Sequence, residues 1–521
     1  MDRVLQPGRN VWRDVTAAAS GVLVDAADYY HAFYWAAANA RRSILISGWE
    51  FDSGVPLLRG ADAPPGAEVR FLKFLNGLCE RTPSLYISLL AWDFNVVLAG
   101  EREWMQRVLF HWLTHERLHF RVDDSPIVGG SHHQKFVVID GRLAFVGGMD
   151  ICEARWDDRR HLADNPVRLV RGQPQKPYHD VQVYLAGGDA PAALEQYFLR
   201  RWQRAGGTLP RLAPPPPGDD DDAARYQPRG ALPLGPTSLV LSRTQPHKTG
   251  LTIREVERLF TDAIASAEHM IYVETQYFSS RRIRDALEAR MREAHRSRLE
   301  VAIVVNERAE AVKEEIAVGL RQVKLVADLR AIAAETGHAL GVYYTMPEGA
   351  ADGDGERSTY VHSKLMVVDD RFLTIGSANL TNRSMGIDSE LHASWEAHPT
   401  DDALRVAIQR VRVSLLAEHS GRMDAPERSF ASMDGLVARL DAMADRPGAR
   451  LRRHSTPTTT EEAILSVIDP QALPFDPESA EPLTRSRARL RGSLSRSENG
   501  RARTARPSLP RSPSERSRHG R

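Results

Sequence analysis

An internal repeat constrains this sequence more than any other feature. The eight-residue pattern His-x-Lys-x4-Asp occurs twice, and equivalent positions are 229 residues apart: His133 and His362, Lys135 and Lys364, Asp140 and Asp369. A second match agrees with this spacing to within two residues, because three apolar positions recur 227 residues later: Phe33, Ala40 and Ile44 as Phe260, Ala267 and Ile271. The repeat therefore predicts two halves with the same fold.

Each copy of the pattern has the features of a buried strand. The residues after Lys135 and Lys364 are mostly Val, Ile, Leu, Met or Phe, and a turn containing Asp follows. His and Lys two positions apart on a strand point to the same face. An imidazole and an ammonium then face one ligand, and the compact ammonium of Lys suits phosphate. Two such faces brought together would surround one tetrahedral anion with two imidazoles and two cations, which suits the cleavage of a phosphodiester.

Helical and strand patterns alternate through both halves. Helical spacing of apolar residues predicts helices at residues 25–40, 68–79, 103–113, 253–267, 281–294 and 309–335. Short apolar runs predict strands at residues 43–49, 85–90, 118–122, 270–278, 299–305 and 340–345. This alternation is typical of α/β folds in which helices cover both faces of a sheet. We therefore predict two similar α/β/α domains.

A Pro, Gly and Asp-rich linker is predicted between the domains. It includes the run Asp219 to Asp222, which we interpret as a solvated acidic loop that does not bind a metal. The predicted divisions are a domain at 10–211, the linker at 212–236, a second domain at 237–416 and an appendage of unassigned structure at 417–484. Residues 485–521 contain twelve Arg, two Glu and few apolar residues, which predicts a disordered Arg/Ser/Pro-rich tail.

Composition and charge indicate where the protein acts. The net charge of the chain is +1, but residues 485–521 carry +10, so the remaining residues carry about −9. The apolar runs are far shorter than the ~18 residues of a spanning helix, and the first residues lack the apolar core of a signal peptide. Cys79 and Cys152 fit neither a disulfide framework nor a zinc-thiolate site. We expect a cytoplasmic protein that associates peripherally with a phospholipid membrane, on its inner face.

The motifs resemble those of the phospholipase D superfamily from about Asn10 to about Leu416. In the first half the resemblance rests on HHQKFVVIDGRLAFVGGMD, on RWDD and on YHDVQ. In the second half it rests on IYVETQYF, on GSAN and on the NRSM and DSE that follow. The resemblance is strongest to phospholipases D proper and extends to cardiolipin synthase-like bacterial enzymes. It implies two α/β domains related by a pseudo-twofold axis, with one active site at their seam, formed within a single chain.

The resemblance also implies roles for individual residues. His133 would attack phosphorus and form a phosphohistidine, and His362 would act as general acid and base, although near-symmetry leaves the opposite assignment open. Glu390 would orient His133, and Asp180 would orient His362. The phosphoryl oxygens would be held by four side chains: Lys135, Lys364, Asn379 and Ser377.

Three acidic residues raise two separate questions. Asp140 and Asp369 belong to the repeated pattern and are candidate catalytic residues, with a structural role at the strand end as the alternative. Asp150 occupies the position equivalent to Asn379, and an ionised Asp cannot donate a hydrogen bond to phosphate. The two half-sites are therefore expected to be unequal. Neither a metal-ligand spacing nor a cofactor motif appears, so we predict a site that uses neither metal nor cofactor.

Four functions fit the motifs to different degrees. The first is a phospholipase D that cleaves or exchanges the headgroup of glycerophospholipids, with water or an alcohol as acceptor and phosphatidic acid as product. The second is a cardiolipin synthase-type phosphatidyltransferase. A phosphodiesterase acting on nucleic acid is disfavoured, because small superfamily nucleases carry one motif per chain. A lipid-binding protein without catalysis is disfavoured by the complete set of catalytic residues. The sequence predicts no particular oligomer.

Overall fold

The computed structural model describes residues 3–92, 114–124, 127, 129–214, 223–247, 251–308, 318–349, 358–424, 426–454 and 476. Three predictions lie outside these residues: the helix at 103–113, the acidic loop at 219–222 and the disordered tail at 485–521. Cys79 and Cys152 are both buried and form no disulfide, as predicted. Among the described residues, no helix is long and apolar enough to cross a membrane.

The first half is built on an eight-stranded sheet of order β12-β2-β11-β7-β6-β3-β4-β5. Neighbours β3, β4 and β5 run parallel, and the other neighbours are antiparallel. Helix α2 separates β3 from β4, as a parallel connection requires. The strands are β2 (Ala19–Val24), β3 (Ser43–Gly48), β4 (Tyr86–Trp92), β5 (Leu118–Asp123), β6 (Lys135–Ile139), β7 (Leu143–Gly147), β11 (Val181–Ala186) and β12 (Leu232–Pro233).

The second half is built on a sheet of order β1-β13-β21-β20-β19-β15-β16-β17-β22, with β14 paired to β13. Its strands are β1 (Arg13–Ala17), β13 (Thr237–Gln245), β14 (Ile253–Arg254), β15 (Met270–Thr275), β16 (Glu300–Val305), β17 (Ala339–Thr345), β19 (Leu365–Val368), β20 (Phe372–Gly376), β21 (Glu390–Glu396) and β22 (Leu451–Arg453). The run β13-β21-β20-β19-β15-β16-β17 repeats the run β2-β11-β7-β6-β3-β4-β5 strand for strand. The predicted α/β fold class is confirmed.

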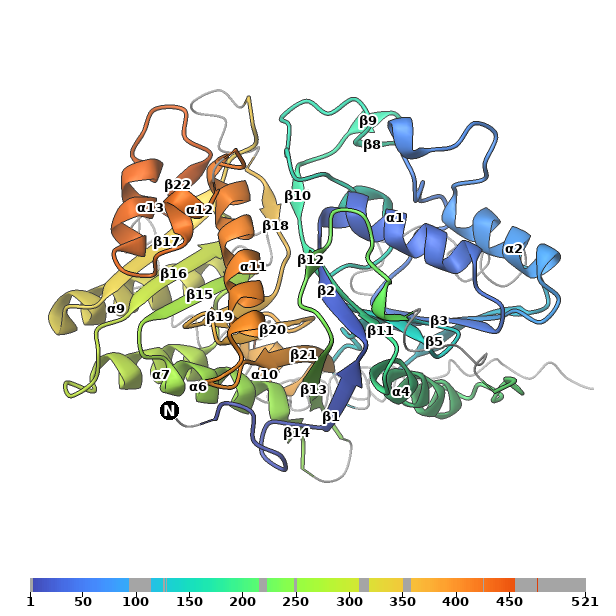
Figure 1. Ribbon diagram of the computed structural model, residues 1–521, viewed down its shortest axis with the longest axis horizontal. Helices are drawn as coiled ribbons and strands as arrows, with labels where there is room; N and C mark the ends of the chain where they lie inside the picture. The colour runs from blue at the N-terminus through green and yellow to red at the C-terminus, as the bar shows by residue number, and fades with distance from the viewer. Residues whose placement is uncertain are drawn as a thin grey trace, which may run out of the picture.

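Helices cover both sheets. Figure 1 shows α1 and α2 on one face of the first sheet and α4 on the other. In the second half, α6, α7 and α9 share one apolar cluster, whereas α11 and α13 belong to another. The helices are α1 (Asp25–Ala38), α2 (Phe71–Arg81), α4 (Ala190–Arg204), α6 (Glu255–Ser266), α7 (Arg281–Met291), α9 (Leu320–Thr336), α10 (Asn382–Gly386), α11 (Asp402–Ser420), α12 (Pro426–Phe430) and α13 (Leu436–Ala444).

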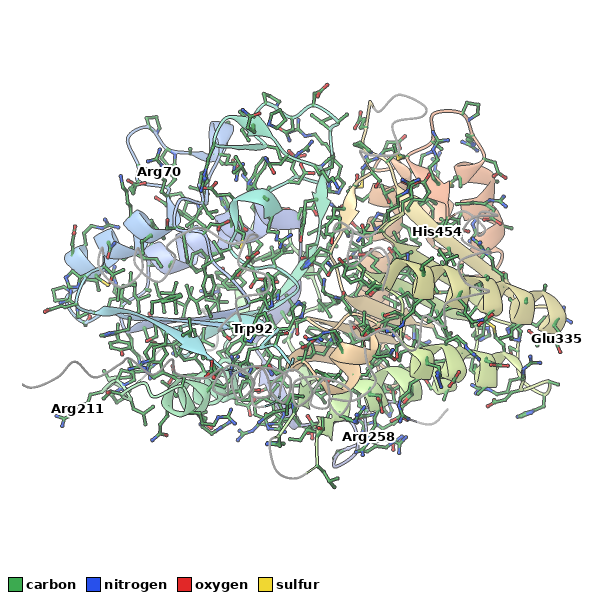
Figure 2. All side chains as sticks on the ribbon, turned by 180° about the vertical axis from the view of Figure 1, so that it is seen from behind. Arg70, Trp92, Arg211, Arg258, Glu335 and His454 are labelled. Carbon is green, nitrogen blue, oxygen red and sulfur yellow. The ribbon has the colours of Figure 1, made fainter. Side chains whose placement is uncertain are left out.

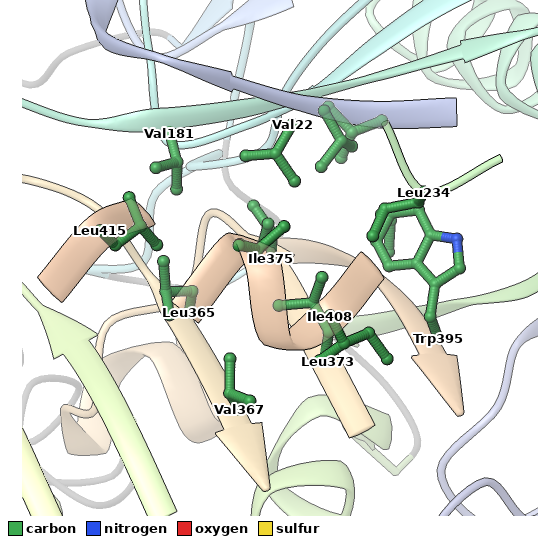
Figure 3. Packing of buried hydrophobic residues seen from close by; sticks show 14 of the residues in the cluster. Val22, Val181, Leu234, Leu365, Val367, Leu373, Ile375, Trp395, Ile408 and Leu415 are labelled. Carbon is green, nitrogen blue, oxygen red and sulfur yellow. The ribbon is translucent and has the colours of Figure 1, made fainter. Parts of the chain in front are cut away.

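The two halves share one apolar core. Val22 and Val181 from the first sheet belong to the same buried cluster as Ile375 from the second sheet and Ile408 and Leu415 from α11 (Figure 3). Seen from behind, side chains fill the space between the halves (Figure 2). Because packed interiors transmit small shifts between neighbours, this core fixes the relative position of the residues at the seam.

Three segments cross the domain boundaries predicted from the sequence. Strand β1 joins the sheet of the second half by pairing with β13. Strand β12 lies inside the predicted linker and pairs with β2 at the sheet edge, where Pro233 is tolerated because an edge strand does not need its N–H. Helix α11 runs through residue 416 to Ser420, since its buried apolar positions continue through Leu415 and Ala417.

Much of the predicted appendage belongs to the second half, as the end of α11, α12, α13 and β22, and Asp476 further along the chain is placed against it too. Asp476 is buried, and its carboxylate accepts hydrogen bonds from Ser279 Oγ at 2.6 Å and from the backbone N–H of Arg383 at 2.8 Å. Arg321 lies 3.3 Å from the same carboxylate. This contact joins the appendage to α10, close to the second motif, and nothing in the sequence pattern indicated it.

The two Asp residues of the repeated pattern have equivalent structural positions. Asp140 accepts backbone hydrogen bonds from Arg41, Arg42 and Ser43 at 2.7–2.9 Å. Asp369 accepts the same three bonds, each at 2.8 Å, from residues 268–270. Both have positive φ, 54° and 53°. Each carboxylate therefore ties the turn after one strand to the start of the neighbouring strand, β3 or β15.

We expect Asp369→Ala to lower the free energy of unfolding by about 3 kcal/mol, because three backbone N–H groups, one buried and two part-buried, lose a charged acceptor. Urea unfolding measures the change. Asp328→Ala removes an exposed carboxylate paired with Lys324, and its free energy of unfolding should stay within ~0.5 kcal/mol of the wild type. Equal stability of the Asp369→Ala protein and the wild type would contradict this structural role.

Candidate active site

The two repeated motifs meet at the seam through backbone pairing. Strand β10 (Tyr178–His179) of the first half pairs in parallel with β18 (Tyr360–Val361) of the second, and the N–H of His362 donates to the carbonyl of His179 at 2.7 Å. On the other side of the site, the N–H of His133 donates to the carbonyl of Ser389 at 3.0 Å. Each motif histidine is thus fixed beside a segment of the opposite half.

This pairing places a carboxylate from one half on each imidazole of the other. Nδ1 of His133 lies 3.1 Å from Oε2 of Glu390, and Nδ1 of His362 lies 2.6 Å from Oδ2 of Asp180. Both carboxylates are fully buried. These are the two pairs that the family resemblance implied. Because each Nδ1 is engaged, Nε2 is the ring atom that remains for a substrate.

The two lysines lie beside the imidazoles, as the strand pattern predicts. Lys135 Nζ donates to the carbonyl of His133 at 3.1 Å, and Lys364 Nζ donates to the carbonyl of His362. Both ammonium groups are almost fully buried. Burial lowers the pKa of Lys364 to about 7; the charge of Asp180 opposes this shift and that of Lys135 adds to it.

The partners of the two lysines differ, as expected from Asp150. Asp150 Oδ2 lies 3.1 Å from Lys135 Nζ, so the first lysine has a buried counterion. Lys364 instead donates to Oε1 of Gln276 at 3.2 Å, and Asn379 Nδ2 donates to the same oxygen at 3.1 Å. The second half-site is therefore more positive than the first.

Gln276 is a site residue that the sequence analysis missed. Besides Lys364 and Asn379, it contacts Tyr360, whose hydroxyl accepts from Gln276 Nε2 at 2.8 Å. Its place just after the carboxyl end of β15 was the available signal, because ligand-binding groups in α/β sheets gather at strand ends. A single amide thus fixes two groups predicted to hold phosphate.

Three of the predicted site residues have other roles in the structure. Ser377 Oγ donates to Glu390 at 2.5 Å and accepts from the backbone N–H of Leu391 at 3.1 Å, so it holds the carboxylate of Glu390 and not the phosphate. Asp140 and Asp369 lie at the far ends of their strands, about 16 Å along the chain from the lysines, where they bind backbone amides. Of the two roles considered for these residues, catalytic or structural, these contacts favour the structural one.

The other histidines near the motifs are hydrogen-bonded to neighbouring groups. His132 Nδ1 lies 2.8 Å from the hydroxyl of Ser389. His392 Nε2 accepts the backbone N–H of Ala378 at 3.1 Å. His161 and His179 each lie between two buried carboxylates.

Burial and neighbouring cations favour neutral imidazoles. Burial lowers the pKa of His133 well below its usual value, and Lys135 and Lys364 act in the same direction. Burial likewise lowers the pKa of His362, and the charges of Lys364 and Arg155 add to the effect. Arg155 itself is held by Glu50 at 3.3 Å and lies over the ring of Tyr178.

The two carboxyl groups shift in the opposite direction. Burial raises the pKa of Asp180 to about 7, although the charge of Lys364 opposes it. Burial and the charge of Asp388 raise the pKa of Glu390 to about 8, against hydrogen bonds from Ser377 and Ser384. Near neutral pH each pair therefore favours a proton shared between Nδ1 of the imidazole and the carboxyl oxygen.

Comparison with known proteins agrees with this geometry. The family described as "Cardiolipin synthase, PLD-like domain" matches residues 260–411. Phospholipase D alpha 2 of Oryza sativa subsp. japonica is 25% identical and covers 79% of this chain and 66% of its own length. Phospholipase D A of Dictyostelium discoideum is 26% identical and covers 71% of this chain and 32% of its own length. The chain thus spans less than two thirds of these two relatives.

A solved structure shows the same fold. Phosphatidylserine synthase from Haemophilus influenzae Rd KW20 superposes with a TM-score of 0.51 at 17% identity, over 79% of this chain and 89% of that one. The repeated motifs, the matched sheets and the sequence similarities agree on one family. The chain is similar to members of the phospholipase D superfamily in sequence and in fold.

Proposed function

We propose that the protein is a phospholipase D-type phosphodiesterase that cleaves or exchanges the headgroup of glycerophospholipids. The observation that carries the proposal is the pair of imidazole–carboxyl contacts made across the seam, at 3.1 Å for His133 and 2.6 Å for His362. Two imidazoles with one buried cation beside each are suited to a double displacement at phosphorus. The similarity to phospholipases D supports a phospholipid as substrate.

In the first displacement, the lone pair of His133 Nε2 forms a bond to phosphorus as the bond from phosphorus to the headgroup oxygen breaks. His362 Nε2–H gives its proton to that oxygen, and the headgroup leaves as an alcohol. Glu390 stabilises the positive charge that develops on His133, because its carboxylate faces Nδ1. The product of this step is a phosphohistidine.

In the second displacement, His362 Nε2 takes a proton from water or from an alcohol. The oxygen so activated forms a bond to phosphorus, and the bond from phosphorus to His133 breaks. Water yields phosphatidic acid, and a primary alcohol yields a phosphatidyl alcohol. Lys135, Lys364 and Asn379 donate to the phosphoryl oxygens in both steps, where negative charge develops.

A phosphatidyltransferase of the cardiolipin synthase type is the second candidate. The match of residues 260–411 to the family described by that name favours it. The chemistry is the same, and only the acceptor differs: a lipid alcohol replaces water in the second displacement.

Mass spectrometry of products from mixed phospholipid vesicles, with and without 1-butanol, tests the function. We expect phosphatidic acid without the alcohol and phosphatidylbutanol with it. His133→Ala and His362→Ala should each lower turnover by at least about 1,000-fold, because residues that act as one unit fail together. Cardiolipin as the dominant product would favour the phosphatidyltransferase instead.

His398→Ala is the matched control for the two histidine variants, since His398 is exposed and follows β21 at the opposite end of that strand from Glu390. Its turnover should equal that of the wild type. Substantial turnover by either motif variant, with the fold intact by circular dichroism, would contradict a single site that needs both imidazoles.

The pH dependence should respond to Arg155. The guanidinium of Arg155 helps lower the pKa of His362, so Arg155→Met should raise that pKa. If His362 is the acid, loss of its proton ends activity at high pH, and the alkaline limb of kcat/KM should move to higher pH. Arg155→Lys keeps the charge and should leave the limb in place. Movement of the acidic limb in Arg155→Met would instead make His362 the nucleophile.

We also propose that the basic tail attaches the enzyme to anionic membranes. Basic residues near an anionic leaflet contribute about 1 kcal/mol each within a Debye length, and residues 485–521 carry a net +10. Deletion of residues 485–521 should weaken sedimentation with phosphatidylserine vesicles at low salt. Turnover of a short-chain soluble substrate should not change. Equal vesicle binding with and without the tail across a salt series would exclude it as an anchor.

A further inference from the structure

A group of buried charged side chains lies at the seam, next to the backbone of His362 and Ser363. We call it the seam network and define it by two histidines and four acids: Asp25, Asp157, His161, His179, Glu274 and Glu418. The first four come from the first half, and the last two come from β15 and α11 of the second half. All six are fully buried.

Both imidazoles of the seam network have a carboxylate at each ring nitrogen. His161 lies 2.9 Å from Asp157 through Nδ1 and 3.0 Å from Glu418 through Nε2. His179 lies 2.8 Å from Glu418 through Nδ1 and 2.9 Å from Glu274 through Nε2. A neutral imidazole donates from only one nitrogen. Both rings are therefore imidazolium ions that donate two hydrogen bonds each.

Cations surround the carboxyl groups of the network. Arg159 pairs with Glu418, and Arg168 pairs with Asp157 at 2.8 Å. With the two imidazolium ions, four cations lie among four carboxyl groups, and burial raises the pKa of one of these, Asp25. Burial alone would lower the pKa of His161, but the charge of Asp25 and the hydrogen bond to Asp157 raise it to about 9. The protons thus stay on the rings at neutral pH.

The network contacts the active site at three points. The N–H of Asp25 donates to the carbonyl of Asp180 at 2.8 Å, and Asp25 Oδ1 accepts the N–H of Asp180 at 3.2 Å. The carbonyl of His179 accepts the N–H of His362 at 2.7 Å. The hydroxyl of Ser363 donates to Glu274 at 2.5 Å. The backbone on both sides of the Asp180–His362 contact is therefore held by the network.

The pair at His133 is held by different groups. The backbone carbonyl of Glu390 accepts from Gln134, which is itself bonded to Arg201, and the N–H of Ser131 donates to Asp388. Glu390 is held by the neutral hydroxyls of Ser377 and Ser384, at 2.5 and 2.8 Å. Its contact with His133 is also longer, 3.1 Å against 2.6 Å for Asp180 and His362. The shorter contact belongs to the pair beside the seam network.

We propose that the seam network fixes His362 against Asp180, and that Glu418 and His161 are positioning residues for the reaction although neither touches the site. The inference rests on the proposed function, because it assigns the network to the histidine that moves the proton. Glu418 is central to it, since its Oε1 accepts from both imidazolium ions and joins α11 to the first half.

A bound metal is the competing interpretation of the same side chains. Ligand atoms of Asp25, His161, His179 and Glu418 all lie within 4.8 Å of one another. However, nitrogen and oxygen ligands about 2.0–2.2 Å from a tetrahedral zinc ion would be about 3.4 Å apart. The observed separations of 2.8 and 3.0 Å from Glu418 Oε1 to the two rings are those of hydrogen bonds. The geometry favours protons over a metal.

The test compares Glu418→Gln with the wild type. The amide keeps the shape of the carboxylate, but its oxygen is neutral. It is therefore a weaker acceptor for the two imidazolium N–H groups that now donate to Glu418 Oε1. We expect kcat to fall at least tenfold with KM within twofold. Hydrogen–deuterium exchange should become faster in peptides spanning residues 178–180 and 360–364. His161→Gln should also lower kcat and speed exchange in these peptides. It replaces Glu418→Gln as the test variant if Glu418→Gln fails to fold.

Arg412→Met is the matched control. Arg412 lies on the same helix, is fully buried and forms an ion pair with Asp370 at 2.6 Å, outside the network. Its loss should lower stability but leave kcat within twofold and exchange at residues 360–364 unchanged. Equal loss of kcat in Arg412→Met would show a general effect of destabilisation and overturn the proposal.

Two other results would overturn the proposal. One is wild-type kcat and unchanged exchange in both Glu418→Gln and His161→Gln. The other is one equivalent of bound metal per chain by mass spectrometry of the purified full-length protein. Absence of phospholipid turnover in the wild type would instead contradict the proposed function, and the exchange experiment would still test the network.

Discussion

Two backbone hydrogen bonds across the seam determine where the reactive groups lie. The N–H of His362 reaches the carbonyl of His179, and the N–H of His133 reaches the carbonyl of Ser389. In each case the carboxylate that meets the imidazole belongs to the residue after the accepting carbonyl, Asp180 or Glu390. A one-residue slip in this pairing would turn the carboxylate to the opposite face. The shared apolar core between the halves prevents such a slip.

The two half-sites are alike in backbone and unlike in charge. Lys135 has a counterion in Asp150 at 3.1 Å, whereas Lys364 meets the neutral amide of Gln276. A buried cation without a close counterion loses its proton more readily, which agrees with the lowered pKa of Lys364. A phosphoryl group would supply the missing negative charge. The first copy of the repeat has Asp150 where the second has Asn379. This difference therefore favours binding of the phosphoryl anion beside Lys364, in the second half.

The repeat made much of the fold and the site predictable. The period of the apolar residues indicated an α/β fold and the strands that carry the motifs. The two-residue spacing of His and Lys indicated that they lie on the same face of each strand. The partners Asp180 and Glu390 came from the family resemblance, because the residues alone do not specify pairing between distant segments. The sequence left the roles of Ser377, Asp140 and Asp369 undecided for a related reason. The position of a polar residue after a strand does not show whether its side chain meets substrate or backbone. Gln276 and Glu418 were missed because each acts through a contact formed only in the folded chain.

Buried charge is the remaining constraint on this architecture. Removing charged groups from water costs several kcal/mol per ion, and pairing recovers that cost only when geometry and hydrogen bonds are nearly complete. In the seam network this condition depends on both halves. Glu418 and Glu274 of the second half accept the hydrogen bonds of His179 from the first half. Neither half separated from the other would balance its own charges. The contact that completes the active site and the contacts that neutralise the seam therefore form together, and docking of the halves is coupled to assembly of the site.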